Sequence, residues 1–573
     1  MNNRFKLLFI ILLILTNNLQ SQVNIKDYEG QWEGQLPSKK TFIFKVNLTK
    51  KTENQFVFKL SNDQFSFENI VTTTSKKHIQ FKFSTGLSFS AILNDDSSEI
   101  NGFISSNFYF YHVKLIKRKD NSYEGTWNIF IIDELISKAL FFSIENVNGQ
   151  SFEAYPFFED KRFRGTWAGK PKIENEIITF QDNITGLHFK GKLLTNKIEL
   201  EIILVGKTIA KTILNKSKNE WFFDDFTSQT NSSNKPLQLN DGWKVSRLKD
   251  CKNLQELERN ILSKKLIKTH SILIAQKGKL VYEKYFGGFT YNTPHDQRSA
   301  SKSISSALIG IAIDKKMIKS DEEFLYNFLP KESQYTKDSL KSLIKISDLL
   351  TMSSGLDAVD FGIKRTSLAS EPAYQNSSDW LKTVLEAPMI NNPGDEANYG
   401  SANPYLLGVS LNNILQQPLE LFIDQQLLSP LGISNYTIQK DRTGIPYFGG
   451  GMYITPRDML KFGQLYLNKG KWNGKRIVSK KWVQKSFKNY RELKNTKDKN
   501  GYGYLWWHKT YKVNKKEIRT IEARGAGGQY IFVIPILDVV VVITSGNYKN
   551  GKFQQPEKIL EKYILPALLI RKH

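Results

Sequence analysis

Apolar residues at every second position constrain the fold of the first part of this chain. They alternate with other residues over positions 42–48, 56–60 and 79–83, and Asn, Asp, Ser and Lys fill the stretches between these runs. A two-residue period places one set of side chains on a single face of a strand, and short strands joined by polar turns form antiparallel structures. We therefore expect residues 22–226 to form an all-β domain, either a sandwich or a barrel.

An aromatic-x-Gly-x-Trp pattern appears three times in this region, at residues 28–32, 123–127 and 163–167. The uneven spacing makes it a weak repeat. Its Trp rings would either bind a ligand such as a glycan or fill the core of the β-domain, and we favour the core.

Residues 227–240 form the expected linker, because the stretch opens with Ser and Asn and holds few apolar residues. After it the pattern changes to mixed α and β. Apolar runs at 270–275 and 280–286 flank a turn and predict a β-hairpin. We expect a fragment that starts near Leu239 to fold by itself, since such a linker separates independent domains.

A second pair of apolar strands, at 530–534 and 539–544, lies near the end of the chain, and mostly helical patterns separate it from the first pair. A sheet assembled from both ends of a segment, with helices between, is an α/β arrangement. The sequence thus predicts that residues 241–573 form an antiparallel sheet flanked by helices, with a helical insert.

The N-terminus has the features of a signal peptide over residues 1–21. Arg4 and Lys6 precede an apolar run from Leu7 to Leu15, which is about half the roughly 20 residues of a membrane-spanning helix. We expect export to the periplasm or the outside of the cell, the alternative being a retained signal and membrane association. Cys251 is the single cysteine, so no disulfide can form within the chain.

The formal net charge of +25 raises the question of an anionic partner. Lysines are spread along the whole chain among acidic residues, and no basic helix, zinc-finger spacing or RNA-binding motif appears. We expect no nucleic-acid binding. An anionic polymer of the cell envelope stays open as a partner, although a solvated surface is the favoured interpretation.

Ser299 and Lys302 are the first candidates for chemistry. They precede a helical pattern with apolar residues at 304, 307, 308, 311 and 312, so Lys302 lies one turn after Ser299 on the same face. A serine hydroxyl needs a base within hydrogen-bond reach, and a partly buried lysine can have its pKa lowered enough to be that base. The same spacing occurs at Ser246 and Ser342, but only Ser299 has a hairpin before it and an apolar-faced helix after it.

Two further segments could complete a site. Tyr399 lies in a turn before an apolar run and could move a proton between nucleophile and leaving group. Gly525, Ala526 and Gly527 lie before the strand at 530–534, where glycines let substrate approach the backbone and expose N–H groups to an oxyanion.

These elements in this order resemble the serine β-lactamase and penicillin-binding superfamily, whose Ser-x-x-Lys motif is matched at 299–302. Within it the chain is most similar to class C β-lactamases and to related carboxylesterases and 6-aminohexanoate-oligomer hydrolases. The resemblance covers about residues 241–569 and includes 349–356, 449–458 and 501–504. The N-terminal β-domain lies outside it.

The resemblance implies a β-lactamase/transpeptidase-like domain that cleaves a small-molecule or peptide-like ester or amide. Ser299 would be acylated, with Lys302 as its partner and Tyr399 as proton shuttle. The backbone N–H groups of Ser299 and Ala526 would form the oxyanion hole. No metal or organic cofactor is implied.

Two departures from the superfamily pattern affect the expected substrate. Ser401 stands where penicillin-recognising members carry the Asn of Tyr-x-Asn, and it remains a candidate substrate-binding residue. Ala523 and Arg524 replace the first two residues of Lys-Thr-Gly or His-Thr-Gly. Because adjacent strand residues point to opposite faces, Arg524 is not expected to replace the missing cation.

Three functions follow as hypotheses. The first is an esterase or amidase, favoured over a β-lactamase. The second is a D,D-peptidase or another peptidoglycan-modifying or β-lactam-recognising enzyme. The third is a catalytically idle binding protein of the envelope, which the complete set of Ser299, Lys302 and Tyr399 disfavours.

Overall fold

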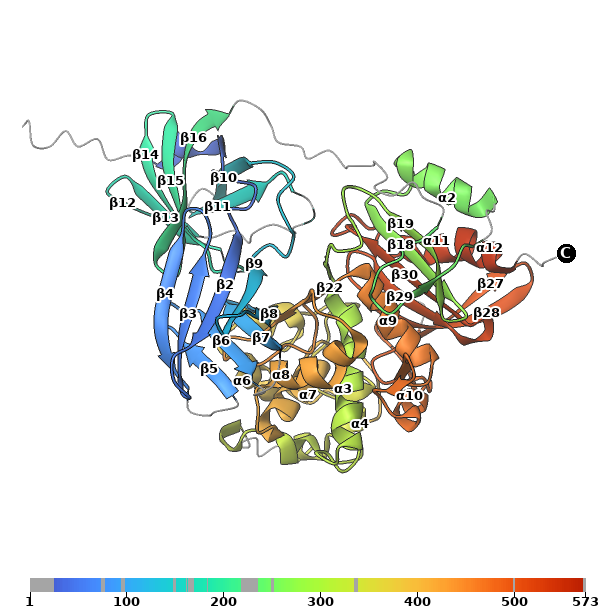
Figure 1. Ribbon diagram of the computed structural model, residues 1–573. Helices are drawn as coiled ribbons and strands as arrows, with labels where there is room; N and C mark the ends of the chain where they lie inside the picture. The colour runs from blue at the N-terminus through green and yellow to red at the C-terminus, as the bar shows by residue number, and fades with distance from the viewer. Residues whose placement is uncertain are drawn as a thin grey trace, which may run out of the picture.

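The computed structural model describes residues 25–73, 78–93, 98–147, 151–160, 162, 170–182, 184–217, 235–248, 252–333, 339–497 and 500–569. The expected signal peptide, the third aromatic-x-Gly-x-Trp copy, most of the expected linker and Cys251 lie outside these residues. Figure 1 shows two parts: a β-domain (25–217) made of strands, and a C-terminal region (235–569) of mixed helices and strands. The predicted fold class is confirmed in both parts.

The β-domain contains two antiparallel sheets. The first has eight strands, in the order β11 (Ser151–Phe158), β10 (Ala139–Val147), β1 (Gly30–Gln35), β16 (Lys207–Ser217), β15 (Lys197–Leu204), β14 (His188–Leu194), β13 (Ile177–Gln181) and β12 (Lys172–Glu174). The second contributes β5 (His78–Lys82), β6 (Ser88–Ile92), β7 (Glu99–Ser106), β8 (Tyr109–Lys117), β9 (Ser122–Asn128), β2 (Ile43–Lys50), β3 (Gln55–Ser61) and β4 (Ser66–Thr72).

The alternating residues of the sequence fill one core beneath both sheets. Phe44, Val46 and Leu48 of β2 are buried, as the two-residue period predicts. Trp32 and Trp127, from the two described aromatic-x-Gly-x-Trp copies, are also buried in this core. Their rings therefore pack inside the protein, as the structural interpretation of the motif predicts.

A nine-stranded sheet forms the centre of the C-terminal region, and it is assembled from both ends of that region (Figure 1). Its order is β17 (Lys244–Val245), β19 (Lys279–Tyr285), β18 (Thr269–Gln276), β30 (Val539–Ser545), β29 (Gln529–Ile534), β28 (Lys516–Gly525), β27 (Trp507–Val513), β26 (Gly501–Tyr502) and β25 (Arg491–Glu492). The predicted hairpin is β18–β19, and the predicted late strands are β29 and β30.

Helices cover both faces of this sheet. One face packs against α2 (Lys252–Leu262), α11 (Gln555–Ile559) and α12 (Leu565–Leu569). The other packs against α3 (Lys302–Asp314), α9 (Pro456–Leu467) and α10 (Lys480–Ser486). The insert supplies α4 (Ile346–Leu350), α5 (Glu371–Asn376), α6 (Trp380–Glu386), α7 (Ala402–Ile414) and α8 (Leu419–Ile423), and a small hairpin pairs β23 (Lys471–Trp472) with β24 (Lys475–Arg476).

The second sheet of the β-domain continues into the C-terminal region. The first residues of β8 pair with β21 (Thr437–Gln439), whereas its last two pair with β9. From β21 the ladder passes to β22 (Met452–Ile454) and β20 (His295–Asp296). One sheet thus runs from the β-domain to a strand that ends three residues before Ser299.

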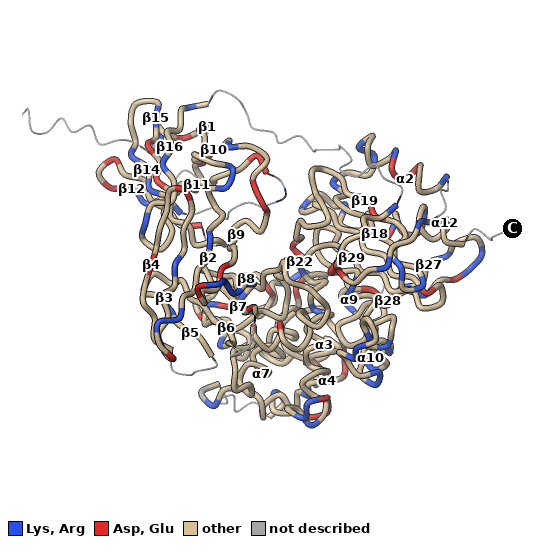
Figure 2. The backbone as a smooth tube through the Cα atoms, viewed as in Figure 1, with Lys and Arg blue, Asp and Glu red and all other residues tan. Residues whose placement is uncertain are grey.

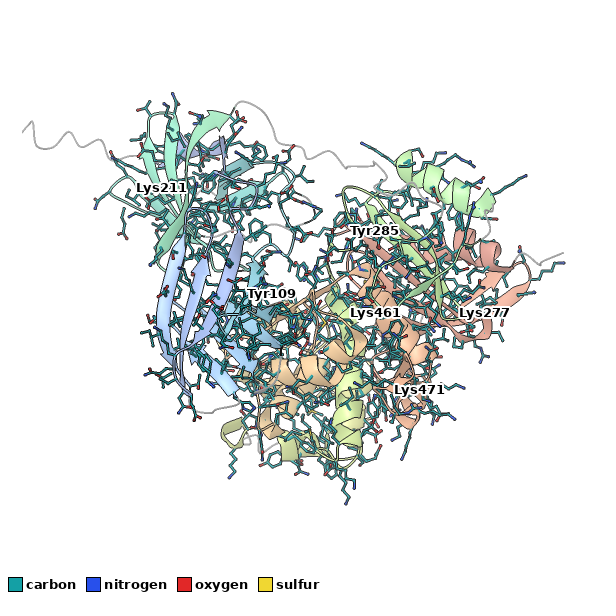
Figure 3. The ribbon with its side chains drawn as sticks, in the orientation of Figure 1. Tyr109, Lys211, Lys277, Tyr285, Lys461 and Lys471 are labelled. Carbon is teal, nitrogen blue, oxygen red and sulfur yellow. The ribbon has the colours of Figure 1, made fainter. Side chains whose placement is uncertain are left out.

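Side chains also cross this boundary. Phe103 and Phe110 of the β-domain pack in the core of the C-terminal region, and Tyr453 packs in the core of the β-domain. Tyr109, labelled in Figure 3, lies on β8 with its ring 5.8 Å from that of Tyr453. The expectation that a fragment from Leu239 folds alone stays a prediction, and these contacts argue against it, because excision would expose apolar residues and an unpaired strand edge.

Charged residues do not gather in one place. Figure 2 shows Lys and Arg spread over both parts and mixed with Asp and Glu. Among the described residues, none of the helices has both the length and the hydropathy to cross a bilayer.

Candidate active site

Ser299 lies in a 3₁₀ turn at the start of a buried helix. The turn η2 spans Arg298–Ser301, and α3 follows it without a break. Residues 302–312 of α3 are all buried, which is typical of a helix at the centre of a domain. Ser299 itself is only half-buried. The helix therefore holds the serine firmly while leaving part of it accessible.

The backbone just before Ser299 is strained. Arg298 has a φ of 48°, a left-handed conformation that costs a bulky residue on the order of 1–3 kcal/mol. Asp296 supports it, since its carboxylate accepts a hydrogen bond from the Arg298 N–H (2.9 Å) and pairs with the guanidinium (3.0 Å). The Ser301 hydroxyl donates to the Arg298 carbonyl at 2.8 Å. These contacts fix the turn that presents Ser299.

Lys302 is buried beside Ser299. Its Nζ lies 2.8 Å from the Ser299 Oγ and 3.0 Å from the Ser401 Oγ, and it also donates to the carbonyl oxygen of Gly449. Burial lowers the pKa of Lys302, whereas the carboxylates of Glu371 and Asp360 oppose that change. The predicted neighbours Ser299 and Lys302 are thus in hydrogen-bond contact.

Tyr399 closes the other side of the pair. The Lys302 Nζ lies 5.1 Å from the centre of its ring, and the Ser299 side chain is close enough to lower the pKa of the phenol against the larger effect of burial. The ring packs against Phe361 and Trp507, with centroids 5.3 and 5.2 Å away. Burial raises the pKa of Tyr399, so the phenol keeps its proton near neutral pH.

The Tyr399-Gly400-Ser401 segment needs its glycine. A Cβ at Gly400 would lie 1.6 Å from the carbonyl oxygen of Ala358, so no other residue fits without moving the backbone. Ser401 is buried at the start of α7, where its hydroxyl donates to Asp360 (2.6 Å). The Ser401 hydroxyl thus makes its hydrogen bonds to two groups of the protein, Asp360 and Lys302.

Gly525 brings the end of β28 against the serine turn. A Cβ at Gly525 would lie 2.1 Å from the carbonyl oxygen of Gln297 and 3.2 Å from the amide nitrogen of Ala300. Gly525 is thus packed against the turn that carries Ser299, and the oxyanion role of residues 525–527 stays a prediction. Ala526 follows and is exposed, and Gly527 has a φ of 81°.

Arg524 is paired with two buried glutamates. Its Nε donates to Glu522 at 2.6 Å, Glu557 lies 3.4 Å from another guanidinium nitrogen, and the group stacks on Trp507. Ala523 points to the other face of β28, into the core that contains α3. The alternation expected for these two residues is observed.

The alternative Ser–Lys spacing at 342–345 does not form a pair. The Ser342 hydroxyl donates to the carbonyl oxygen of Ser339, and the Lys345 ammonium lies 3.0 Å from Glu322. For the third spacing, Lys249 lies outside the described residues.

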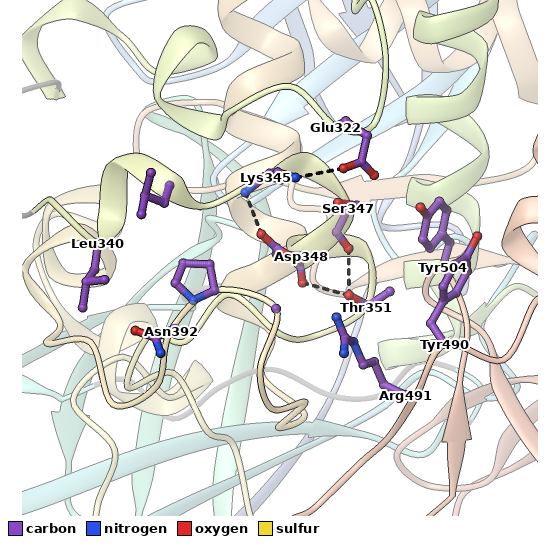
Figure 4. A pocket seen from close by; sticks show the side chains of 13 residues that line it. Glu322, Leu340, Lys345, Ser347, Asp348, Thr351, Asn392, Tyr490, Arg491 and Tyr504 are labelled. Atoms are coloured by element: carbon purple, nitrogen blue, oxygen red, sulfur yellow. Dashed lines mark hydrogen bonds and ion pairs between the residues drawn. The ribbon is translucent and has the colours of Figure 1, made fainter.

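A cavity of about 620 Å³ lies elsewhere in the C-terminal region (Figure 4). It is lined by α4, by residues 392–394 and by Arg491 and Tyr504, and Lys345 and Glu322 form an ion pair at its edge. Ser299, Lys302 and Tyr399 are not among its lining residues. Across the described part of the chain, no group of three or more His, Cys, Asp or Glu side chains is placed to hold a metal ion.

The C-terminal region matches known proteins. A family profile described as Beta-lactamase matches residues 254–562. The chain is 28% identical over 174 residues to proteins of Mycobacterium tuberculosis, covering 25% of this chain and 43% of theirs. It is 23% identical over 293 residues to the 6-aminohexanoate-dimer hydrolase of Paenarthrobacter ureafaciens, covering 48% and 71%. The chain thus spans less than half the length of the first relatives.

Solved structures of low sequence identity are also similar. The simvastatin synthase of Aspergillus terreus aligns with a TM-score of 0.45 and 15% identity, covering 55% of this chain and 98% of that one. A penicillin-binding protein of Bacillus halodurans aligns with a TM-score of 0.41 and 16% identity, covering 52% and 97%.

Proposed function

The chain belongs to the Beta-lactamase family, and from this premise we propose that it is a serine hydrolase that cleaves an ester or amide bond through an acyl-enzyme on Ser299. The observation that carries the proposal is the 2.8 Å distance between the buried Lys302 Nζ and the Ser299 Oγ. That distance suits transfer of the serine proton to the amine.

The steps follow from the positions of three side chains. The neutral amine of Lys302 accepts the Ser299 proton while the Ser299 oxygen bonds to the substrate carbonyl carbon. The carbonyl oxygen becomes an oxyanion, which backbone N–H groups beside Gly525 would stabilise. As the oxyanion collapses, the leaving group departs and takes a proton by way of Tyr399. Water then attacks the acyl-enzyme, the same groups move its proton in reverse, and Ser299 is released.

The substrate class is proposed from β28. An anionic substrate would need a cation near the end of this strand, but Ala523 is apolar and Arg524 is neutralised by Glu522 and Glu557. These contacts support neutral esters or simple amides rather than substrates that carry a carboxylate beside the scissile bond.

Labelling with a fluorophosphonate tests the proposal, because the reagent phosphonylates activated serines. The wild-type protein should be labelled on Ser299, as found by peptide mapping, and Ser299→Ala should lose both the label and hydrolysis of p-nitrophenyl butyrate. Loss of one side-chain hydrogen bond costs about 1 kcal/mol, so the variant should remain folded.

The matched control is Ser342→Ala, which removes a serine with the same spacing to a lysine but with no contact between them. It should be labelled and active like the wild type. Label on another serine instead of Ser299 would overturn the assignment of the nucleophile. A folded wild-type protein that takes up no label would overturn the proposal and favour the idle binding protein.

A further inference from the structure

Two buried carboxylates lie next to the proposed catalytic lysine. Asp360 lies in the loop between α4 and α5 and accepts hydrogen bonds from both the backbone N–H (2.8 Å) and the hydroxyl (2.6 Å) of Ser401. Its other oxygen accepts the backbone N–H of Glu371 at 2.8 Å, and its own N–H donates to the Tyr399 carbonyl at 3.1 Å. Asp360 therefore ties Tyr399, Ser401 and α5 together.

Glu371 is the second carboxylate, in the first turn of α5. The Tyr447 hydroxyl donates to it at 2.6 Å and also contacts the hydroxyl of buried Tyr374. Tyr447 lies two residues before Gly449, whose carbonyl accepts from Lys302. Asp360 thus reaches Lys302 through the Ser401 hydroxyl, whereas Glu371 bonds the segment whose Gly449 carbonyl accepts from Lys302.

Asp360 determines how the Lys302 amine uses its hydrogen-bond donors. A neutral amine has two N–H donors and one lone pair. The Ser401 hydroxyl proton is committed to Asp360, so the Ser401 oxygen can only accept from Lys302. Gly449 takes the other N–H. The lone pair is left for the hydroxyl of Ser299, which is the arrangement that proton transfer requires.

Nearby charges also affect the protonation of Lys302. Burial favours the neutral amine, and Arg298 does so too, whereas Glu371 and Asp360 favour the ammonium. Burial also raises the pKa of Asp360, with Glu371 adding to the rise and Lys302 opposing it. Tyr399, Tyr374 and Tyr447 have pKa values raised by burial and remain neutral. The ionisable charges around the amine are therefore Asp360, Glu371 and Arg298.

We propose that Asp360 and Glu371 are positioning residues that set the protonation of Lys302, Asp360 by orienting the Ser401 hydroxyl and both by their negative charge. This inference rests on the proposed function, since it assigns a task to groups around the Ser299–Lys302 pair.

The test is the pH dependence of the second-order rate of fluorophosphonate labelling of Ser299, which requires no knowledge of the substrate. The rate should rise with pH as Lys302 loses its proton. In Asp360→Asn and Glu371→Gln a negative charge near the ammonium is gone, so Lys302 should lose its proton more readily. The rising limb should move to lower pH by roughly one unit in each variant.

Glu420→Gln is the matched control, because Glu420 is a buried carboxylate bound to Ser90 and is not among the charges that act on Lys302. The rising limb of its pH–rate profile should coincide with that of the wild type. Circular dichroism confirms folding, and either of the two variants suffices if the other does not fold.

The two possible failures are distinguishable. Ser299-dependent labelling with an unmoved limb in the folded variants, whether or not the rate falls uniformly, would overturn the inference alone. Labelling that persists in Ser299→Ala would overturn the proposed function.

Discussion

At the scale of single residues, the surroundings of Lys302 and Tyr399 suit the two proton-transfer roles proposed for them. Burial removes water from both groups and disfavours the charged form of each, which is the ammonium for Lys302 and the phenolate for Tyr399. Lys302 is thereby suited to accept a proton. Tyr399, which keeps its own proton near neutral pH, is suited to pass one on rather than to act as a standing base.

Lys302→Ala and Tyr399→Phe should each lower kcat far more than they raise KM, because both groups move protons rather than bind substrate. General acid–base groups typically contribute about 10²–10⁴-fold. The measurement is steady-state hydrolysis of p-nitrophenyl butyrate. Lys345→Ala and Tyr405→Phe are the controls, the second removing a buried phenol bound to Asp441, and both should stay within a few-fold of the wild type. A Tyr399→Phe variant as active as these controls would exclude Tyr399 from the mechanism.

The site was predictable from sequence where its geometry is local. Ser299 and Lys302 lie three residues apart on one helical turn, so their spacing alone brings them together. The hydrogen bond from Ser401 to Asp360 spans 41 positions of a chain with 56 acidic residues, and no local pattern marks the one that folds back. The same applies to Glu371, which reaches Tyr447 across 76 positions.

At the scale of elements, the alternation of β28 decides where Ala523 and Arg524 point. This alternation sends Ala523 into the core and Arg524 toward Glu522 and Glu557, so the cation at the end of this strand is paired within the protein. Strand alternation made this orientation predictable from sequence. The same alternation places Glu522 on the face of Arg524, two residues away on the strand. Glu557 was not predictable, because it comes from α11 near the end of the chain.

Nitrocefin should therefore be a poor substrate compared with p-nitrophenyl butyrate. Lack of a charged hydrogen bond to the β-lactam carboxylate costs roughly 1.5–3 kcal/mol, or about ten- to hundred-fold in kcat/KM, and the neutral ester lacks that group. The comparison is made on the wild type and on Arg524→Lys, which keeps the charge but not the planar fork, and the ratio should be the same in both. A wild type that prefers nitrocefin contradicts the prediction, and selective loss of that activity in Arg524→Lys would show that Arg524 binds the carboxylate.

The sequence predicted the local elements of the fold but not its short strands with distant partners. The β18–β19 hairpin is local, and its apolar runs predicted its bounds within about one residue. By contrast, β21 has only three residues and exists because it pairs with β8, more than 300 positions earlier. A strand defined by such a distant partner leaves little periodicity in its own sequence.

At the scale of the whole molecule, a sheet of the β-domain supports the turn that carries Ser299. Its sheet continues through β21 and β22 to β20, whose Asp296 holds the strained turn at Arg298. Backbone hydrogen bonds cross the boundary on both sides of β21, from His112 to Tyr436 and from Lys440 to Phe108. The two parts therefore share one sheet, despite the linker-like sequence between them.

Cutting the chain between the two parts should not separate them. A protease site placed within residues 227–234 allows the purified protein to be cleaved after folding. The paired edges of β8 and β21, the stacking of Phe108 on Trp380 and the buried contact of His112 with Asp424 should hold the pieces together, because separation would expose each of them to water. The cleaved protein should elute from gel filtration as one species and keep its activity on p-nitrophenyl butyrate, whereas cleaved protein in urea should give two species.

A fragment of residues 239–573 produced alone should have a lower melting temperature and a lower kcat, since β20 and the Arg298 turn lose their support. Two separate peaks under native conditions, with full activity in the C-terminal piece, would contradict this view and restore an independent C-terminal domain.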